Sequence, residues 1–179
     1  MSIVLNGTTG ITTPASTVGG SAVLTTASTI AASALPAGSV IQVVHSTYST
    51  VVVGTAGAEV FTGVSASITP TSASSKILII FNGSIETSGV KSNFAVGVNL
   101  RRGTSTSSTL LSNQRSGHYH GATINAEMSS THGFNYLDSP ATTSSVTYGL
   151  FVYNIDGSPV WRFNNNSGKS EFTFMEIAA

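Results

Sequence analysis

Two histidines that are two residues apart form the sharpest candidate for chemistry in this chain. His118 and His120 would lie on the same face of an extended segment, and imidazole is a common transition-metal ligand. Around a threefold axis, three copies would bring six imidazoles to one ion. Alternatively, residues 116–121 form an exposed aromatic loop. Because one pair of histidines is a weak signal, we predict no metal site and no cofactor.

The acidic residues and serines show no catalytic pattern. The seven Asp and Glu residues are scattered without a close pair, whereas glycoside hydrolysis needs two carboxylates about 5 to 10 Å apart. Serine is abundant, but no G-x-S-x-G motif is present, and the segment Gly7–Gly10 lacks the lysine of a phosphate-binding loop. We therefore predict no catalytic residues and no enzymatic activity. A polysaccharide hydrolase would require the fold to bring two carboxylates together in a cleft.

Asparagine and aromatic residues provide the side chains for a carbohydrate-binding surface. Planar amides bond sugar hydroxyls, and aromatic rings cover the apolar face of a sugar. Trp161 is compatible with this role, but the run Val160–Phe163 can form a strand, so we favour a core position for it. Since recognition is usually carried by loops, we expect contact at residues 103–108, 115–122 and 162–168. The candidate residues are Arg115, His118, Tyr119, His120, Asn164 and Asn165.

The composition excludes several classes of partner. Only 8% of the 179 residues are charged, and seven basic residues balance seven acidic ones. This neutrality gives no electrostatic attraction to nucleic acid or to an anionic membrane. The chain has no cysteine, and we find no pattern of a signal peptide or a membrane span. Because a neutral, weakly charged monomer is poorly soluble, we expect the chain to be part of an assembly.

Short apolar runs separated by Gly and Pro predict an all-β fold. Helical periodicity is hard to find, and eight or more β-rich runs favour an antiparallel β-sandwich or jelly roll. The expected strands are Val40–His45, Tyr48–Val53, Val64–Ile68, Ile77–Phe81, Phe94–Arg101, Thr109–Leu111, Val146–Tyr153 and Phe172–Ile177.

Some of these runs carry apolar residues on both faces. Between Val146 and Tyr153 the alternation places Tyr148, Leu150 and Val152 opposite Phe151 and Tyr153. An antiparallel strand normally has one solvated face, so a second layer must cover the outer one. The cover can come from a loop, from the N-terminal segment or from a neighbouring subunit. A closed homo-oligomer would supply it.

The first thirty-five residues contain no charged side chain and consist mainly of Thr, Ser, Gly and Ala with scattered aliphatic residues. Such a segment buries too little apolar surface to offset an ordering entropy of about 1 to 2 kcal/mol per residue. We therefore expect it to be held by another chain. The predicted organisation is an extended arm over residues 1–38 followed by a β-sandwich domain over residues 39–179.

Several segments resemble tail-fibre and other virion structural proteins of tailed bacteriophages. They span nearly the whole chain in the order found in that family: Ile3–Ile11, Leu35–Val43, Ser67–Pro70, Ser74–Leu78, Leu100–Gly103, Tyr136–Pro140 and Phe174–Ala179.

The resemblance implies a non-enzymatic virion component that is homotrimeric and projects a β-rich knob. It implies that the N-terminus attaches to other virion proteins of the tail or baseplate, through Ile3, Val4, Leu5, Asn6, Gly7 and Ile11. Long fibres of this kind carry a shaft between arm and tip, and its absence here favours a short appendage that contacts a host-surface glycan. The alternative is a capsid decoration or cement protein, whose arm lies across capsid subunits.

Overall fold

The computed structural model describes residues 17–18, 21–22, 35–55, 57–156 and 160–179. Within these ranges, the side chains of residues 17–22, 90–94, 116–126 and 156 are not described. The chain divides into two compact units, residues 1–31 and residues 32–179. In the first, β1 (Thr17–Val18) and β2 (Ser21–Ala22) pair as a short antiparallel ladder. Residues 1–16, 19–20 and 23–34 of the predicted arm, which include its attachment residues, lie outside the described residues.

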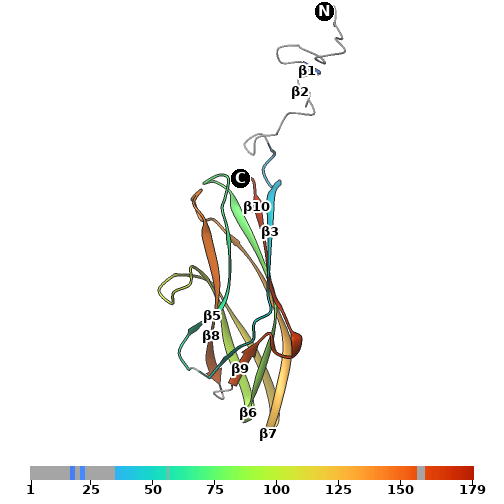
Figure 1. Ribbon diagram of the computed structural model, residues 1–179, viewed down its shortest axis with the longest axis vertical. Coiled ribbons are helices and arrows are strands. Elements are labelled where there is room, and N and C mark those ends of the chain that lie inside the picture. The colour runs from blue at the N-terminus through green and yellow to red at the C-terminus, as the bar shows by residue number, and fades with distance from the viewer. Residues whose placement is uncertain (1–16, 19–20, 23–34, 56, 157–159) are drawn as a thin grey trace, which may run out of the picture. The chain divides into compact units, whose positions relative to one another are not determined.

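The second unit is an antiparallel β-sandwich, as predicted (Figure 1). Its elements are β3 (Val40–Tyr48), β4 (Val52–Gly54), β5 (Val60–Ile68), β6 (Lys76–Arg102), β7 (Thr109–Asp138), β8 (Val146–Asp156), β9 (Val160–Phe163), a 3-10 turn (Asn165–Ser167) and β10 (Ser170–Ile177). None of the described helices is long and apolar enough to cross a membrane.

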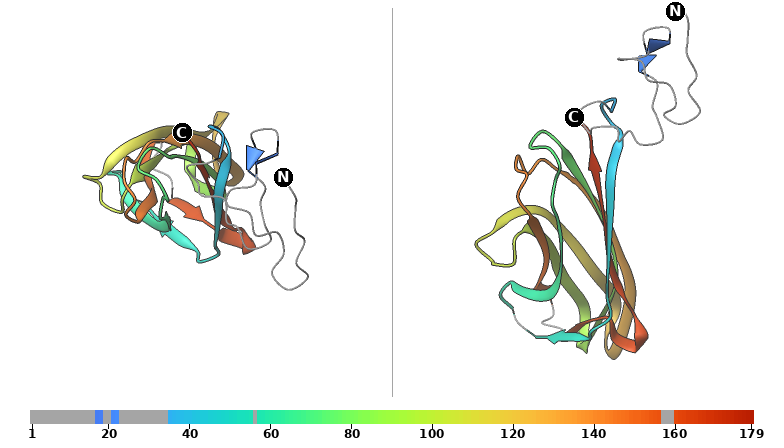
Figure 2. Two further views of the ribbon diagram at one scale, coloured as in Figure 1. Left: turned by 90° about the horizontal axis from the view of Figure 1, so that it is seen from above. Right: turned by 45° about the horizontal axis from the view of Figure 1, so that its top comes forward.

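A single long ribbon, β6 paired with β7, takes part in both layers of the sandwich. Its ladder runs from Ile77↔Asp138 to Arg102↔Thr109. Residues 76–82 of β6 also pair with β10, and β10 pairs with β3; together with residues 133–138 of β7 they form what we call the first layer. Residues 95–102 of β6 pair with β8, and β8 pairs with β5; together with residues 109–117 of β7 they form the second layer (Figure 2).

The core lies between the two layers. On β6, Ile77, Ile79 and Phe81 project inward from the first layer, while the alternating set Val96, Val98 and Leu100 projects inward from the second; all six are 0% exposed. Burying a side chain of this kind contributes about 1.5 to 3 kcal/mol. Aromatic rings join the layers. Tyr148 of β8 lies 5.3 Å from Phe174 of β10, measured between ring centroids.

Several predicted boundaries are wrong. The run Tyr48–Val53 was expected as one strand, but β3 ends at Tyr48 and β4 begins at Val52. Ile77–Phe81 and Phe94–Arg101 were expected as separate strands, and both belong to β6 because the ladder with β7 continues through Gly83. Residues 115–122 were expected as a loop, but they lie in β7. In the last two cases cross-strand pairing overrides the local preference of Gly for turns. By contrast, residues 104–108 do form the turn between β6 and β7.

The outer face of β8 is covered at Phe151 by side chains of neighbouring strands in the same sheet and not by a separate layer. Phe151 projects from the outer face of β8 and is 0% exposed. The ring of Phe61 from β5 lies 5.2 Å from it, between centroids, and the Arg101 guanidinium lies 5.6 Å from the centroid of the same ring. The cover over Phe151 therefore comes from side chains of its own sheet, and not from the loop, N-terminal segment or neighbouring subunit that was expected.

Candidate functional site

The outer face of the second layer carries the most distinctive arrangement of polar and aromatic side chains. Because Val96, Val98 and Leu100 point into the core, Gly97, Asn99 and Arg101 lie on the outer face. The pairing places Arg115 of β7 and Tyr153 of β8 on either side of Gly97. The next row is Asn113, Asn99 and Phe151. We call the group Gly97, Asn113, Arg115 and Tyr153 the tyrosine platform.

The absence of a side chain at Gly97 allows the Tyr153 ring to lie against the sheet. A Cβ atom at position 97 would be 2.1 Å from Cε1 of Tyr153, which is far too close for two carbon atoms that are not bonded to each other. The ring therefore occupies the space above β6, between β8 and β7. Asn113 Nδ2 of β7 donates a hydrogen bond of 2.9 Å to the Tyr153 hydroxyl. The ring is thus fixed at both ends, and Tyr153 as a whole is half-buried.

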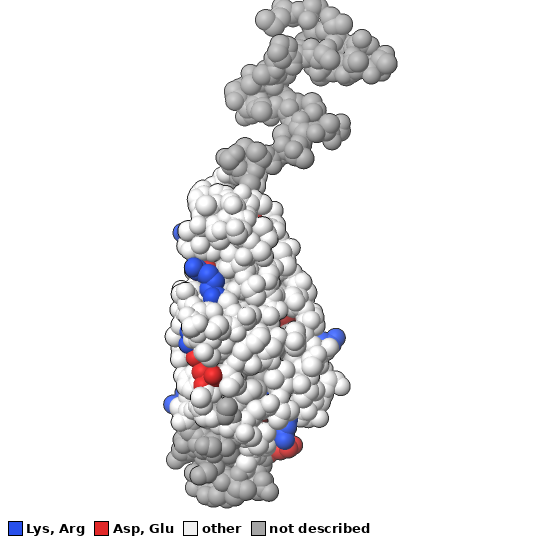
Figure 3. All heavy atoms as spheres, turned by 60° about the vertical axis from the view of Figure 1, so that its left-hand side comes forward, with Lys and Arg blue, Asp and Glu red and all other residues white. Residues whose placement is uncertain are grey.

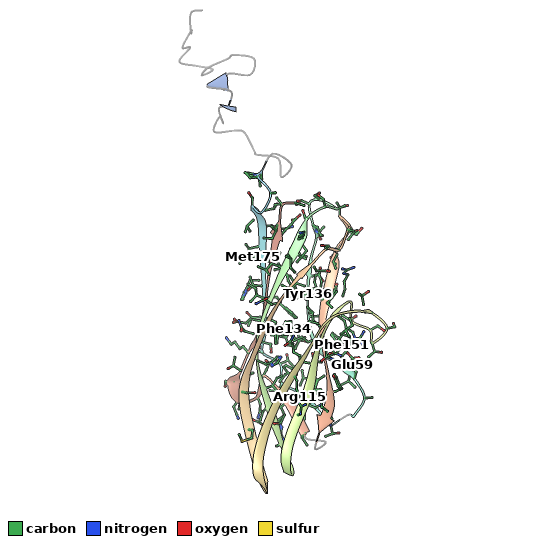
Figure 4. The ribbon with its side chains drawn as sticks, turned by 180° about the vertical axis from the view of Figure 1, so that it is seen from behind. Glu59, Arg115, Phe134, Tyr136, Phe151 and Met175 are labelled. Atoms are coloured by element: carbon green, nitrogen blue, oxygen red, sulfur yellow. The ribbon has the colours of Figure 1, made fainter. Side chains whose placement is uncertain are left out.

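Arg115 is the exposed cation of the tyrosine platform. The other three arginines are held by carboxylates: Arg101 by Glu59, Arg102 by Asp138 and Arg162 by Glu86. Arg115 makes no hydrogen bond or ion pair with any described residue. Its guanidinium therefore keeps its donors available to a ligand (Figure 4).

Beside the platform, Glu59 is closed off by its own partners. Arg101 donates to its two carboxylate oxygens from Nε (2.9 Å) and Nη2 (2.7 Å), and Asn99 Nδ2 donates at 2.8 Å. The hydrogen bonds from Arg101 lower the pKa of Glu59 below its ordinary value; burial opposes this and Asn99 adds to it. Figure 3 shows how few other charged groups lie on this largely neutral surface. Glu59 therefore fixes Arg101 over Phe151 and adds little free negative charge to the platform.

A second polar cluster lies where β9 leads into the asparagine turn. Glu86 of β6 accepts hydrogen bonds from Arg162 Nη1 and from Asn165 Nδ2, both at 2.8 Å. Asn164 and Asn166 have left-handed backbone angles, with φ of 57° and 51°, which asparagine tolerates better than most residues. The turn thereby directs Asn165 onto the buried Glu86 carboxylate.

The structure corrects the expectation that Asn164 contacts a ligand. Asn164 is only 1% exposed. Asn164 Nδ2 donates to the carbonyl of Thr50 at 2.9 Å, and its Oδ1 accepts from Ser170 at 2.7 Å. Asn164 therefore closes the turn against two neighbouring segments, because a buried amide must satisfy its own donors and acceptors.

The remaining candidate residues fall in different places. Arg115 lies on the tyrosine platform, whereas Asn165 lies in the Glu86 cluster, and no described hydrogen bond joins the two. His118, Tyr119 and His120 lie in the part of β7 whose side chains are outside the described residues. The predicted core position of Trp161 is confirmed, since that residue is 2% exposed.

Sequence reasoning missed Tyr153, Asn113 and Gly97 as parts of one site. A glycine inside an alternating strand marks a close approach of another group, and Gly97 carried this signal. The residue that approaches it could be identified only with the register of β8 against β6, because a shift of one residue reverses which face each side chain occupies.

No family model matches the chain, and no curated protein matches it. Three solved structures from infectious bursal disease virus resemble its fold. The structure of the Gx strain is 14% identical, with a TM-score of 0.40, and the match covers 79% of this chain and 34% of that one. A VP2 mutant in T=1 particles is 13% identical, with a TM-score of 0.41, and the match covers 75% of this chain and 32% of that one. The VP2 subviral particle is 11% identical, with a TM-score of 0.40, and the match covers 79% of this chain and 39% of that one.

The match therefore spans about a third of the length of these viral proteins. At this level of identity the likeness concerns the β fold alone, and we draw no functional argument from it.

Proposed function

We propose that the chain is a short tail fibre of a tailed bacteriophage. Its N-terminal arm would attach to the virion through Ile3–Gly7 and Ile11, and its β-sandwich knob, residues 39–179, would contact a host-surface glycan as a homotrimer. The resemblance of several segments to virion structural proteins supports the location on the particle. The tyrosine platform is the observation that supports the proposed contact with a glycan.

The chemistry of the platform suits a sugar. An aromatic ring that is held flat against a sheet presents an apolar surface to the C–H face of a pyranose. The Asn113 amide and the Arg115 guanidinium flank this ring and supply hydrogen-bond donors for hydroxyl groups. Because Gly97 and Asn113 hold the ring in place, little side-chain entropy is lost on binding.

An apolar row on the outer face of the first layer supports the homotrimer. The pairing aligns Val43, Met175, Leu78 and Leu137 across four neighbouring strands. Val43 and Leu137 are 56% and 51% exposed, respectively. The strand β3 contains no charged residue and no proline, the features that usually protect a sheet edge from pairing. A second copy of the chain is the cover that we propose for this row.

Labelled antibodies against the knob, applied to intact virions, test the proposed location. We expect the label on the tail. Label on the head would overturn the tail-fibre proposal and would favour the capsid decoration alternative.

Removal of residues 1–31 tests the role of the arm, because the second compact unit begins at Ala32. The truncated protein should fold and form the same oligomer but fail to enter virions. Normal incorporation would refute an attachment role for the arm, and the circular dichroism spectrum of the truncated protein controls for misfolding.

A further inference from the structure

We propose that the glycan bound at the tyrosine platform is acidic, with a sugar carboxylate paired to Arg115 while the sugar ring stacks on Tyr153. This inference rests on the proposed function, because it names the ligand class of the same site.

The distribution of charge singles out Arg115. The guanidinium groups of Arg101, Arg102 and Arg162 each pair with a carboxylate that is at most 18% exposed. These three pairs belong to the framework of the domain. Arg115 is exposed, and no described group neutralises it. In a chain with so few charges, an unpaired arginine beside a fixed aromatic ring is the group that a negatively charged ligand would neutralise.

The geometry places the cation within reach of one sugar residue bound on the ring. Tyr153, Gly97 and Arg115 occupy one row across β8, β6 and β7, and two adjacent strand spacings separate β8 from β7 by about 10 Å. The Tyr153 ring spans part of this distance, since its hydroxyl reaches Asn113 of β7. A pyranose stacked on the ring therefore has its substituents directed toward Arg115.

A carboxylate is the anion that fits this arrangement best. The guanidinium presents parallel N–H donors that match the two oxygens of a carboxylate in a bidentate pair. Glu59, the neighbouring described carboxylate of this face, is occupied by Arg101 and Asn99 and does not compete for Arg115. Uronic acids and sialic acids are sugars that carry such a carboxylate on a pyranose ring. A sugar phosphate shares the negative charge, and the test separates it from the carboxylate.

The test measures binding of the full-length protein to immobilised oligosaccharides by biolayer interferometry. The probes are oligogalacturonate and oligosialic acid, the methyl ester of each, and a glycerol phosphate polymer. The wild-type protein should bind one of the two carboxylate probes at least about tenfold more tightly than its methyl ester. Equal affinity for acid and ester, or tighter binding of the phosphate polymer, would overturn the inference.

The variants assign the preference to Arg115. Arg115→Gln should remove the tenfold preference for the acid and leave the weaker affinity for the ester within about twofold, whereas Arg115→Lys should retain part of the preference. Lys76→Gln removes an exposed cation elsewhere on β6 and should change neither affinity. An unchanged preference in Arg115→Gln would refute the assignment.

The same experiment distinguishes this inference from the proposed function. Tyr153→Ala should weaken binding of acid and ester alike, because both stack on the ring. If the wild-type protein binds the esters through Tyr153 but shows no preference for the acids, only the acidic ligand is refuted. If it binds none of the probes, both the acidic ligand and glycan contact at the platform are refuted.

Discussion

Replacement of Tyr148 by phenylalanine tests how the two layers are held together. Tyr148 is 0% exposed, and its hydroxyl donates a hydrogen bond of 2.7 Å to Oδ2 of Asp138. Arg102 Nε donates to the same carboxylate oxygen at 2.9 Å. The substitution removes one hydrogen bond to a buried charged group and leaves the arginine in place. A hydrogen bond of this type contributes about 1.5 to 3 kcal/mol to stability, so we expect a loss of about 2 kcal/mol.

Urea unfolding followed by circular dichroism measures this loss. In thermal unfolding of a domain of this size, a loss of about 2 kcal/mol corresponds to a decrease of about 4 to 8 °C in Tm. Tyr136→Phe is the matched control, because Tyr136 is half-buried against the same core and its hydroxyl makes no hydrogen bond with a described residue. Tyr136→Phe should lower the free energy of unfolding by less than about 0.5 kcal/mol. Equal losses in the two variants would refute the assigned role of the hydroxyl.

Alkaline pH provides a second measurement on the same pair of variants. Burial, and then the hydrogen bond to Asp138, raise the pKa of Tyr148 far above its ordinary value. In the unfolded chain this hydroxyl ionises near pH 10. Its contribution to stability is therefore complete below about pH 10 and decreases as the pH rises further, because only the unfolded state releases the proton. The difference between the wild-type protein and Tyr148→Phe should narrow from pH 8 to pH 11, and a constant difference would contradict this reasoning.

Three further predictions concern other parts of the sandwich. Burial lowers the pKa of His132, so the stability of the wild-type protein, measured by urea unfolding, should fall as the pH drops below about 6.5, and His132→Leu should lessen this dependence. Phe61→Ala uncovers Phe151 and should cost about 1 to 2 kcal/mol in the same assay, less than a fully buried phenylalanine, because Phe61 is 36% exposed. Val43→Asp should dissociate the proposed homotrimer in sedimentation experiments, whereas Thr47→Asp, further along the same face of β3, should not.

The sandwich could be predicted from the sequence because short β-rich runs are separated by Gly and Pro. In the expected strand Phe94–Arg101 the alternating residues Val96, Val98 and Leu100 form part of the core. The two-sided apolar pattern of Val146–Tyr153 correctly required an outer cover. Local alternation is visible in a single strand, and these features needed no knowledge of which strands pair.

The candidate site was harder to predict because it depends on pairing. Arg115 was selected from a segment that was wrongly expected to be a loop, and it became part of a site only through the register of β7 against β6. Asn164 was selected for its residue type, but the left-handed turn directs it inward. Residue type indicates which chemistry is available, whereas the ladder decides which residues meet.

The pairing of β3 with β10 has a mechanical consequence. The chain enters the sandwich through residues 35–39 and continues directly into β3, which is held along its length by β10 from Val40↔Ile177 to Tyr48↔Ser170. A force applied to the N-terminal end of β3 along the direction of that strand would act parallel to both strands. All the interstrand hydrogen bonds then resist the force together as a shear joint, instead of opening one after another as in a zipper. A tether attached to the domain at β3 and pulled in this direction would therefore load the β3–β10 pair in shear, the direction in which the pair is mechanically strongest.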